Sequence, residues 1–164
     1  MDAERVAGLL AGAPPEAVVF FVATTPVFEL RGAIPLAIGA YGMTPAEAYV
    51  LGVLGNLVPV VALLLLLEPV SVFLRRHSDL MDGFFDWLFE RTRYRVEASY
   101  RRYGALALVP FVAVPLPVTG AWTGCAAAFV FGVPNRLAFP AITLGVMISG
   151  VLVTSAATGA FHLI

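Results

Sequence analysis

The sequence predicts an all-α integral membrane protein, and three observations lead to this prediction. Hydrophobic residues make up 60% of the 164 positions and charged residues only 13%, whereas soluble domains carry roughly 45–50% apolar and 25% charged residues. The mean hydropathy is +0.89. Two apolar stretches, 45–67 and 134–161, exceed the roughly 20 residues that a helix needs to cross a bilayer. A soluble protein with a very apolar core is the alternative, but core elements do not need stretches of this length.

Charge divides the chain into segments of a single membrane domain. Between residues 17 and 67 the only charged side chains are Glu29, Arg31 and Glu47, and after residue 102 the only one is Arg136. The start of the chain lacks a basic region ahead of an apolar stretch, so no cleaved signal peptide is expected. The predicted segments are an amphipathic N-terminal piece (1–15), a first membrane repeat (16–67), a polar Arg-rich segment (68–102) and a second membrane repeat (103–164).

The first repeat contains two short apolar runs, 17–28 and 33–43, separated by Pro26 and the segment Glu29-Leu30-Arg31-Gly32. A helix over the first run measures roughly 18 Å and is too short to cross a bilayer. The segment Thr44-Pro45-Ala46-Glu47 then has the pattern of a capping box with proline at the first helical position. It predicts the start of a spanning helix over 45–67.

The second repeat follows the same order. Short runs at 106–114 and 121–133 flank a proline and glycine break, and Pro134-Asn135-Arg136 opens a long helix to about Phe161. Overlaying the halves pairs Gly32 with Gly120, Pro45 with Pro134, Glu29 with Pro117 and Arg31 with Thr119. Paired interrupted segments of this kind are typical of inverted-repeat transporters. We therefore expect each half to be a re-entrant hairpin plus one transmembrane helix; the alternative is that each pair of short runs forms one kinked spanning helix.

The middle segment is expected on the cytoplasmic side, because it carries most of the arginines. Over residues 79–90 the acidic and the apolar side chains fall on opposite helical faces, which predicts a central amphipathic helix at the membrane interface. The alternative is a solvated linker helix.

Glu29 and Arg31 are the most informative candidate site residues. A charge inside a membrane is costly, so it usually faces protein or water and serves a function. Burial disfavours the charged form of a carboxyl group, which would let Glu29 take up and release a proton near neutral pH. Arg31 can bind a phosphate or carboxylate through two hydrogen bonds. The alternative is that the two side chains pair with each other and only close the loop.

The facing break supplies the second group of candidates. Its prolines leave carbonyl groups without donors, and Gly120 and Gly124 form a GxxxG pattern that also suits plain helix packing. Asn56, in the first long helix, suits either a pathway or a hydrogen bond between helices. The predicted substrate or proton pathway consists of Glu29, Arg31, Gly32, Pro35, Asn56, Pro115, Pro117, Thr119, Gly120, Thr123 and Arg136.

Several kinds of chemistry are not expected. The sequence has no G-x-x-x-x-G-K-[ST] motif and no visible nucleophile–base pair, which argues against ATP-driven transport by this chain and against an enzyme. Neither His77 nor His162 has a metal-ligand partner at a suitable spacing, and the lone Cys125 cannot form an intrachain disulfide. We expect no metal, no cofactor and no nucleic-acid partner.

Two motifs carry a family resemblance. The segments PVFELRGAIPLAIGAYG (26–42) and PLPVTGAWTGCAAAFVFG (115–132) resemble the small multidrug export protein family of prokaryotes, and the similarity extends to GNLVPV (55–60) and RYGALALVPFVAVPLP (102–117). That family looks like a distant relative of the DedA/VTT superfamily. The resemblance implies two facing re-entrant hairpins and proton-dependent transport or flipping of lipids. DedA proteins typically carry an arginine-containing stretch after the second hairpin, for which only Arg136 stands here.

These observations lead to one functional prediction and one alternative. We expect a small proton-coupled membrane transporter for a small amphipathic or lipid-like substrate, with membrane lipids as neighbours and a homodimer or larger assembly. The alternative is a membrane scaffold or lipid-binding protein that transports nothing.

Overall fold

The computed structural model describes residues 12–77, 83, 104–115 and 120–162. These residues form helices and no strand, so the prediction of an all-α fold is confirmed for this part of the chain. The predicted N-terminal amphipathic helix over 2–11 lies outside the described residues, and so does all of the predicted interfacial helix except Gly83. In chain order the elements are α2 (Pro15–Thr24), α3 (Glu29–Gly39), α4 (Pro45–His77), the 3-10 helix η1 (Gly104–Ala107), α6 (Leu108–Ala113), α7 (Ala121–Val130) and α8 (Asn135–His162).

Helices α4 and α8 are long and apolar enough to cross a membrane, over Pro45–Phe73 and Asn135–Ala160. The predicted end of the first long helix at Leu67 was wrong, because α4 continues to His77. Glu68 is exposed, so its charge does not interrupt the helix, and residues 69–74 after it are apolar except for Ser71. The Ser71 hydroxyl donates a 2.7 Å hydrogen bond to the Glu68 carbonyl.

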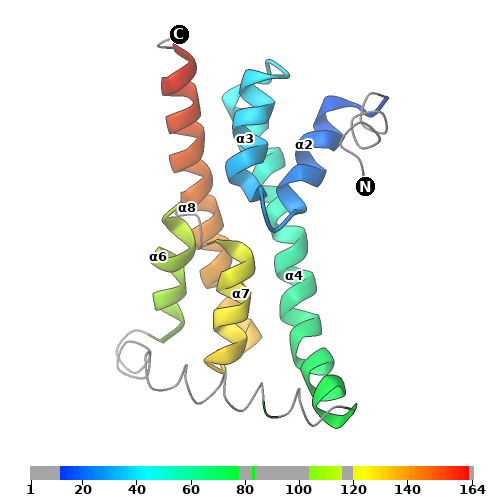
Figure 1. Cartoon of the computed structure of the whole chain (residues 1–164). Coiled ribbons are helices and arrows are strands. Elements are labelled where there is room, and N and C mark those ends of the chain that lie inside the picture. Colours follow the sequence, from blue (N-terminus) through cyan, green and yellow to red (C-terminus); the bar gives the residue numbers. More distant parts are fainter. Residues whose placement is uncertain (1–11, 78–82, 84–103, 116–119, 163–164) are drawn as a thin grey trace. The chain divides into compact units, whose positions relative to one another are not determined.

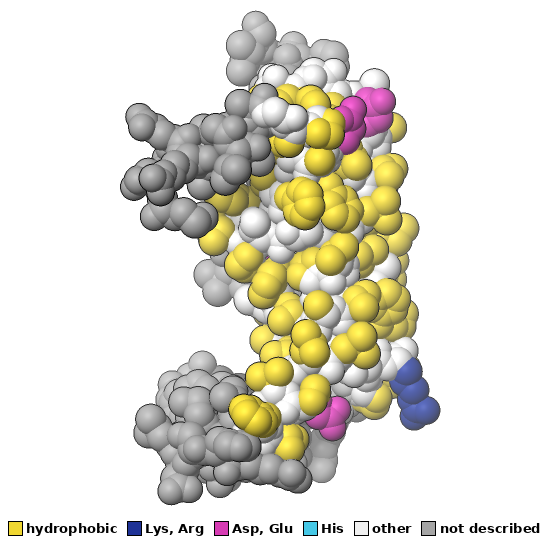
Figure 2. Space-filling view, turned by 90° about the vertical axis from the view of Figure 1, so that its right-hand side faces the viewer, with side chains coloured by type: hydrophobic (Ala, Val, Ile, Leu, Met, Phe, Trp, Pro, Cys, Tyr) yellow, Lys and Arg dark blue, Asp and Glu magenta, His cyan; other side chains and the backbone are white. Residues whose placement is uncertain are grey.

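The outer faces of both long helices are apolar. Figure 2 shows hydrophobic side chains covering most of the described surface on one face, with few charged groups among them. Such stripes are expected of helices that face lipid, where no polar side chain is needed. The exposed stripe is formed on α4 by Val50, Leu54, Val58, Val61 and Leu65, and on α8 by Leu144, Met147, Ile148, Val151 and Leu152.

The predicted capping box at the start of α4 is confirmed. The Thr44 backbone N–H and hydroxyl donate to Glu47 Oε2 at 2.9 and 2.8 Å. The Glu47 backbone N–H donates to Thr44 Oγ1 at 3.3 Å. Two backbone donors that would otherwise lack partners are thus satisfied, which explains why the helix begins at Pro45.

The chain divides into two compact units, one of Met1–Asn56 with Gly150–Ile164 and the other of Leu57–Ser149. We call them the first and the second unit. Each contains one pair of short helices together with part of α4 and part of α8.

In the first unit, α2 and α3 pack against each other as a helical hairpin (Figure 1). Helix α2 ends at Thr24 because Thr25 is extended, with φ −77° and ψ 144°, the conformation that a following proline favours. The Thr25 carbonyl accepts a 3.0 Å hydrogen bond from the Glu29 N–H. The sequence placed Glu29 to Gly32 inside the break, and this was wrong: the turn covers 25–28, and these residues form the first turn of α3.

Helix α4 meets this hairpin at two glycines. A β-carbon on Gly52 would lie 2.8 Å from Ile34 Cγ1, and one on Gly55 would lie 2.5 Å from the Phe20 carbonyl oxygen. Helix α8 reaches α4 at a third glycine, since a β-carbon on Gly150 would lie 2.8 Å from Tyr49 Cε2. Small residues at such contacts allow helices in a membrane to approach closely.

In the second unit, α6 and α7 form another pair (Figure 1). Helix α6 ends at Ala113, and Val114 is extended ahead of Pro115. A β-carbon on Gly145 of α8 would lie 2.7 Å from Val112 Cβ, and one on Gly124 of α7 would lie 2.6 Å from Val112 Cγ2. Glycine residues thus lie at close helix–helix contacts in both units.

Candidate functional site

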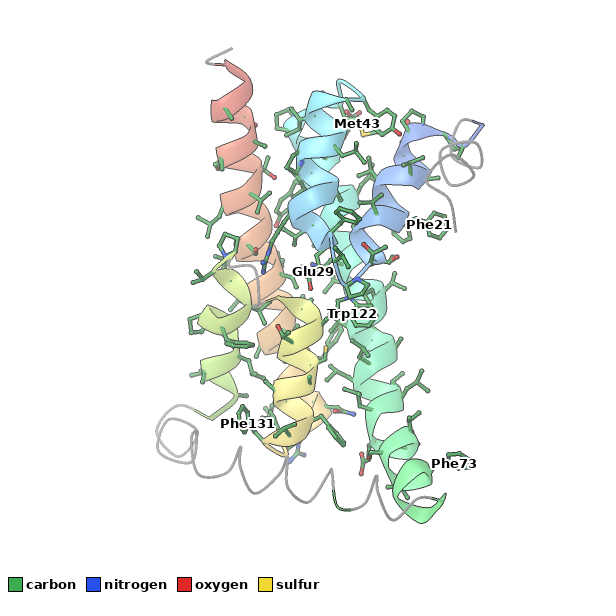
Figure 3. All side chains as sticks on the ribbon, in the orientation of Figure 1. Phe21, Glu29, Met43, Phe73, Trp122 and Phe131 are labelled. Atoms are coloured by element: carbon green, nitrogen blue, oxygen red, sulfur yellow. The ribbon has the colours of Figure 1, made fainter. Side chains whose placement is uncertain are left out.

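The candidate site of the first unit begins with Glu29. This residue is the first of α3 and only 7% exposed. Figure 3 shows it at the end of α3 next to the α2–α3 turn, whereas Met43 lies beyond the opposite end. The hairpin therefore holds a carboxyl group at its turn, away from the loop that leads into α4.

The backbone of Glu29 is strained. Its φ is +47°, and it is the only non-glycine residue with a positive φ in the described part of the chain. This conformation costs an L-residue roughly 1–2 kcal/mol, and such strain persists mostly where a function requires it. A glycine or asparagine would fit the backbone better, so the carboxylate at this position has a reason other than the geometry of the turn.

Arg31 lies two residues further along α3, and its side chain is 21% exposed. Its Nη2 lies 4.0 Å from Glu29 Oε2, beyond the roughly 2.7–2.9 Å of a charge-assisted hydrogen bond. The two groups therefore form an ion pair at this distance. Of the charged residues described in this unit, Glu29 and Arg31 are not exposed, whereas Glu16 and Glu47 are.

Gly32 and Pro35 shape the first two turns of α3. A β-carbon on Gly32 would lie 2.8 Å from Phe28 Cβ, so a larger residue would disturb the turn. Pro35 lies inside the helix, and because it has no N–H, the Arg31 carbonyl loses its usual donor four residues later. Both residues thus act on the backbone beside the ion pair.

Asn56 is the fifth predicted residue of this unit. It is 1% exposed, and its Oδ1 has no hydrogen-bond partner within the described ranges. It follows Gly55, the contact point of α2 on α4. An amide oxygen that is buried without a hydrogen-bond partner destabilises the folded state by about 1–3 kcal/mol. A ligand that donated a hydrogen bond to Asn56 Oδ1 would offset this cost.

The remaining predicted residues belong to the second unit. Pro115 is exposed, while Gly120 is buried and caps α7 with φ 156° and ψ −169°, a region essentially restricted to glycine. The Thr123 hydroxyl donates a 3.2 Å hydrogen bond to the Gly120 carbonyl. Arg136 is exposed near the start of α8. Pro117 and Thr119 lie outside the described residues.

The second unit also contains a pocket of about 360 Å³ that sequence reasoning missed. Asn135 Nδ2 donates a 2.8 Å hydrogen bond to the Leu64 carbonyl and closes one side of it. The only local signal was Asn135 itself, which the sequence indicated merely as part of a helix start. The pocket is lined by Leu64, Leu67, Glu68, Phe129, Gly132, Val133, Pro134 and Asn135.

Comparison with known proteins identifies the family. A model of the family described as "Putative small multi-drug export protein" matches residues 29–152, a stretch that contains every predicted site residue. No curated protein and no solved structure shows a significant match. An export family and two apolar helices of spanning length are both consistent with a membrane protein. The chain therefore belongs to the small multi-drug export protein family.

Proposed function

We propose that this protein is a proton-coupled membrane transporter for a small amphipathic or lipid-like substrate, and that Glu29 carries the proton. The observation behind the proposal is a carboxyl group that is 7% exposed, in a strained backbone, at the turn of a helical hairpin. Ionisable groups at membrane depth commonly mark proton or ion pathways. The family description supports export as the direction of transport.

The proposal includes two re-entrant hairpins. Helices α2 and α7 have ten residues each, or about 15 Å, which is half of the roughly 30 Å hydrocarbon core. Each hairpin would enter the membrane with one short helix and return to the same face with the other. The Arg-rich segment between the repeats would lie in the cytoplasm, and the hairpins would enter from opposite faces.

An internal repeat with a shift of 90 residues is part of the same proposal. Gly42 and Gly132 both have φ +64°, and each lies three residues ahead of the first residue of a long helix. Gly55 on α4 receives α2, and Gly145 on α8 receives α6. Gly52 contacts Ile34, and at the corresponding positions Ile142 contacts Gly124. With a shift of 90 residues, Glu29 pairs with Thr119 instead of Pro117. The repeat supports kinship with the DedA/VTT architecture.

Arg31 would bind the anionic group of a substrate. Its side chain is 21% exposed, and it forms an ion pair with Glu29 at 4.0 Å. A guanidinium group binds phosphates and carboxylates through two hydrogen bonds, which favours lipid phosphates. A cationic drug would instead use Glu29, so both substrate classes belong in the test.

The test measures proton flux in liposomes that contain the purified protein. Internal pH is followed under an imposed gradient while a phospholipid, a polyprenyl phosphate or a cationic dye is added. We expect one substrate to move protons through the wild type and Glu29→Gln to be silent. Glu16→Gln is the matched control, because Glu16 is also a carboxylate at the start of a hairpin helix but is exposed; it should keep the wild-type flux.

The opposite result would favour a scaffold. If no substrate moves protons through the wild type, the transport proposal fails, and a lipid-binding scaffold becomes the better explanation. If Glu29→Gln retains full flux, transport stands but Glu29 is not the proton site.

A further inference from the structure

The pocket of about 360 Å³ in the second unit has no part in the proposed function. Pockets that bind small molecules usually measure roughly 300–1,000 Å³ and combine apolar walls with a few polar groups. Here the walls come from one segment of α4, from the end of α7 with the loop after it, and from the first residue of α8. The pocket is therefore large enough for a small ligand, and its lining indicates the chemistry of that ligand.

The wall on α4 ends at a carboxylate. Leu64 and Glu68, which both line the pocket, are four residues apart and lie on one face of the helix. One turn before Leu64 this face meets α7, since Cys125 Sγ lies 3.9 Å from the Val60 carbonyl oxygen as a hydrogen-bond donor. One turn after Leu64 the same face reaches Glu68.

The opposite wall is held by backbone and amide hydrogen bonds. Gly132 has φ +64°, and its N–H donates to the Phe129 carbonyl at 3.1 Å, as in the turns that end helices. Asn135 Nδ2 donates to the Leu64 carbonyl at 2.8 Å and thereby fastens the start of α8 to α4. Both walls thus belong to one connected structure.

Glu68 decides the sign of charge that the pocket prefers, because it is the only charged residue among the lining residues. The end of α7 and the start of α8 both reach the pocket. They carry partial charges of about half a unit each and of opposite sign, which offset each other. Arg136 follows Asn135 but is exposed and does not line the pocket. The complementary ligand is therefore a cation.

The rest of the lining favours an apolar body on that cation. One of the apolar residues is the aromatic Phe129, and the face of an aromatic ring attracts positive charge. A zwitterionic lipid headgroup fits less well, because its phosphate would lie close to the Glu68 carboxylate and be repelled. The apolar lining residues are Leu64, Leu67, Phe129, Val133 and Pro134.

We propose that the pocket of the second unit binds a small free lipophilic cation, with its charge at Glu68 and its apolar body against Leu64, Phe129 and Val133. Glu68 lies near the C-terminal end of the candidate span Pro45–Phe73, so it lies near one membrane surface, where a cation enters from water. The site goes beyond the proposed function, which concerns the first unit, and its binding can be measured without transport.

The first experiment measures binding of phenyltrimethylammonium, a permanent cation with an apolar ring, by equilibrium dialysis of the protein in a neutral detergent. We expect Glu68→Gln to weaken binding about fivefold, the scale of an ion pair at an exposed carboxylate. Glu16→Gln is the control, because Glu16 is also exposed but belongs to the first unit. A wild type that does not bind the cation, or equal affinities of wild type and Glu68→Gln, would overturn the proposal.

The second experiment reverses the charge. Glu68→Lys should lose phenyltrimethylammonium and gain benzenesulfonate, which has a similar apolar ring and the opposite charge. Lysine is a good helix former, and Glu68 is exposed, so the helix should tolerate the change. Binding of phenyltrimethylammonium by Glu68→Lys at wild-type affinity would show that the cation binds elsewhere and would overturn the site.

The third experiment tests the space. Gly132→Asn adds a side chain to a lining residue, and asparagine tolerates a positive φ. We expect the affinity for phenyltrimethylammonium to fall about tenfold, because part of the pocket is filled. Gly42→Asn is the matched control, since Gly42 has the same φ of +64° and likewise nothing within 4 Å of an added β-carbon, but lies in the first unit. Equal affinities of the two variants would overturn the pocket as the place of binding.

The last experiment separates a free cation from a lipid. Phosphatidylethanolamine and phosphatidylglycerol with the same acyl chains are added to the dialysis as competitors, and we expect neither to displace phenyltrimethylammonium. Displacement by phosphatidylethanolamine alone would overturn the free cation as the occupant and assign the pocket to a lipid headgroup.

Discussion

At the scale of single residues, Glu29 joins two properties that rarely coincide, a positive φ and a buried carboxyl group. Either property alone could be structural. Together they indicate that the backbone tolerates a poor residue for the turn in order to keep a carboxylate there. The same carboxylate forms an ion pair with Arg31 at 4.0 Å.

This leads to a prediction about stability. Glu29→Gly should raise the free energy of unfolding by about 1 kcal/mol, because glycine adopts a positive φ without steric cost, while proton flux is lost. Denaturant unfolding in detergent measures the change. The control Glu16→Gly, at an ordinary helical position, should lower the same free energy by about 1 kcal/mol. A loss of 2 kcal/mol or more in Glu29→Gly, on the scale of a broken structural ion pair, would show that the carboxylate holds the fold.

At the scale of elements, the starts of the long helices follow from local chemistry and were predictable. The pattern Thr44-Pro45-Ala46-Glu47 satisfies the first backbone donors of α4 within four residues, so no distant part of the chain is needed. The end of α2 was misplaced because Pro26 favours an extended Thr25, three residues before the apolar run ends at Phe28. The end of α4 was misplaced because an exposed Glu68 leaves the helix intact.

The site was predictable only in part. Glu29 and Arg31 are visible in the sequence because charges are rare in an apolar run. The pocket that Asn135 closes was invisible, because its lining comes from segments that are distant in the chain.

The glycine contacts lead to a prediction about the hairpin. Gly55→Ala should lower the free energy of unfolding by about 2–3 kcal/mol, because the added methyl group would lie 2.5 Å from the Phe20 carbonyl oxygen, which is backbone and cannot rotate away. Gly159→Ala on α8 is the control, since nothing lies within 4 Å of its added β-carbon. It should leave stability unchanged or raise it by up to about 1 kcal/mol. Equal effects of the two changes would contradict a close contact at Gly55.

At the scale of the whole molecule, charge and apolar surface together lead to a prediction of orientation. The apolar stripes on α4 and α8 are what lipid would cover, and the arginines of the segment 68–102 favour the cytoplasmic side. With two crossings, the C-terminal end of α8 then lies outside. We therefore expect residues near one membrane surface to be accessible to reagents outside the cell, and residues near the other surface to be accessible only from the cytoplasm.

Cysteine labelling of intact cells measures this orientation. In a Cys125→Ala background, Gly159→Cys should react with a membrane-impermeant maleimide, whereas Gly83→Cys should react only after lysis. Both glycines are exposed and have nothing within 4 Å of an added β-carbon, so neither substitution should disturb the fold. The reverse pattern would invert the proposed topology, and labelling of both positions in intact cells would rule out a single orientation.

In the first unit the short helix supplies the large residue of the contact and the long helix supplies the glycine, whereas in the second unit these roles are reversed. This reversal determines which parts of the two halves could be exchanged in a chimera. Ile34 fits against Gly52, and Ile142 fits against Gly124. A chimera that moves the first hairpin alone onto α8 would set isoleucine against isoleucine, and one that moves the second hairpin alone onto α4 would set glycine against glycine. The first combination is overpacked and the second leaves a void, and both are unfavourable in a close-packed interior. Only a hairpin transferred together with the first turns of its own long helix would remain compatible, so the smallest exchangeable module of this protein is the hairpin with the helix that receives it.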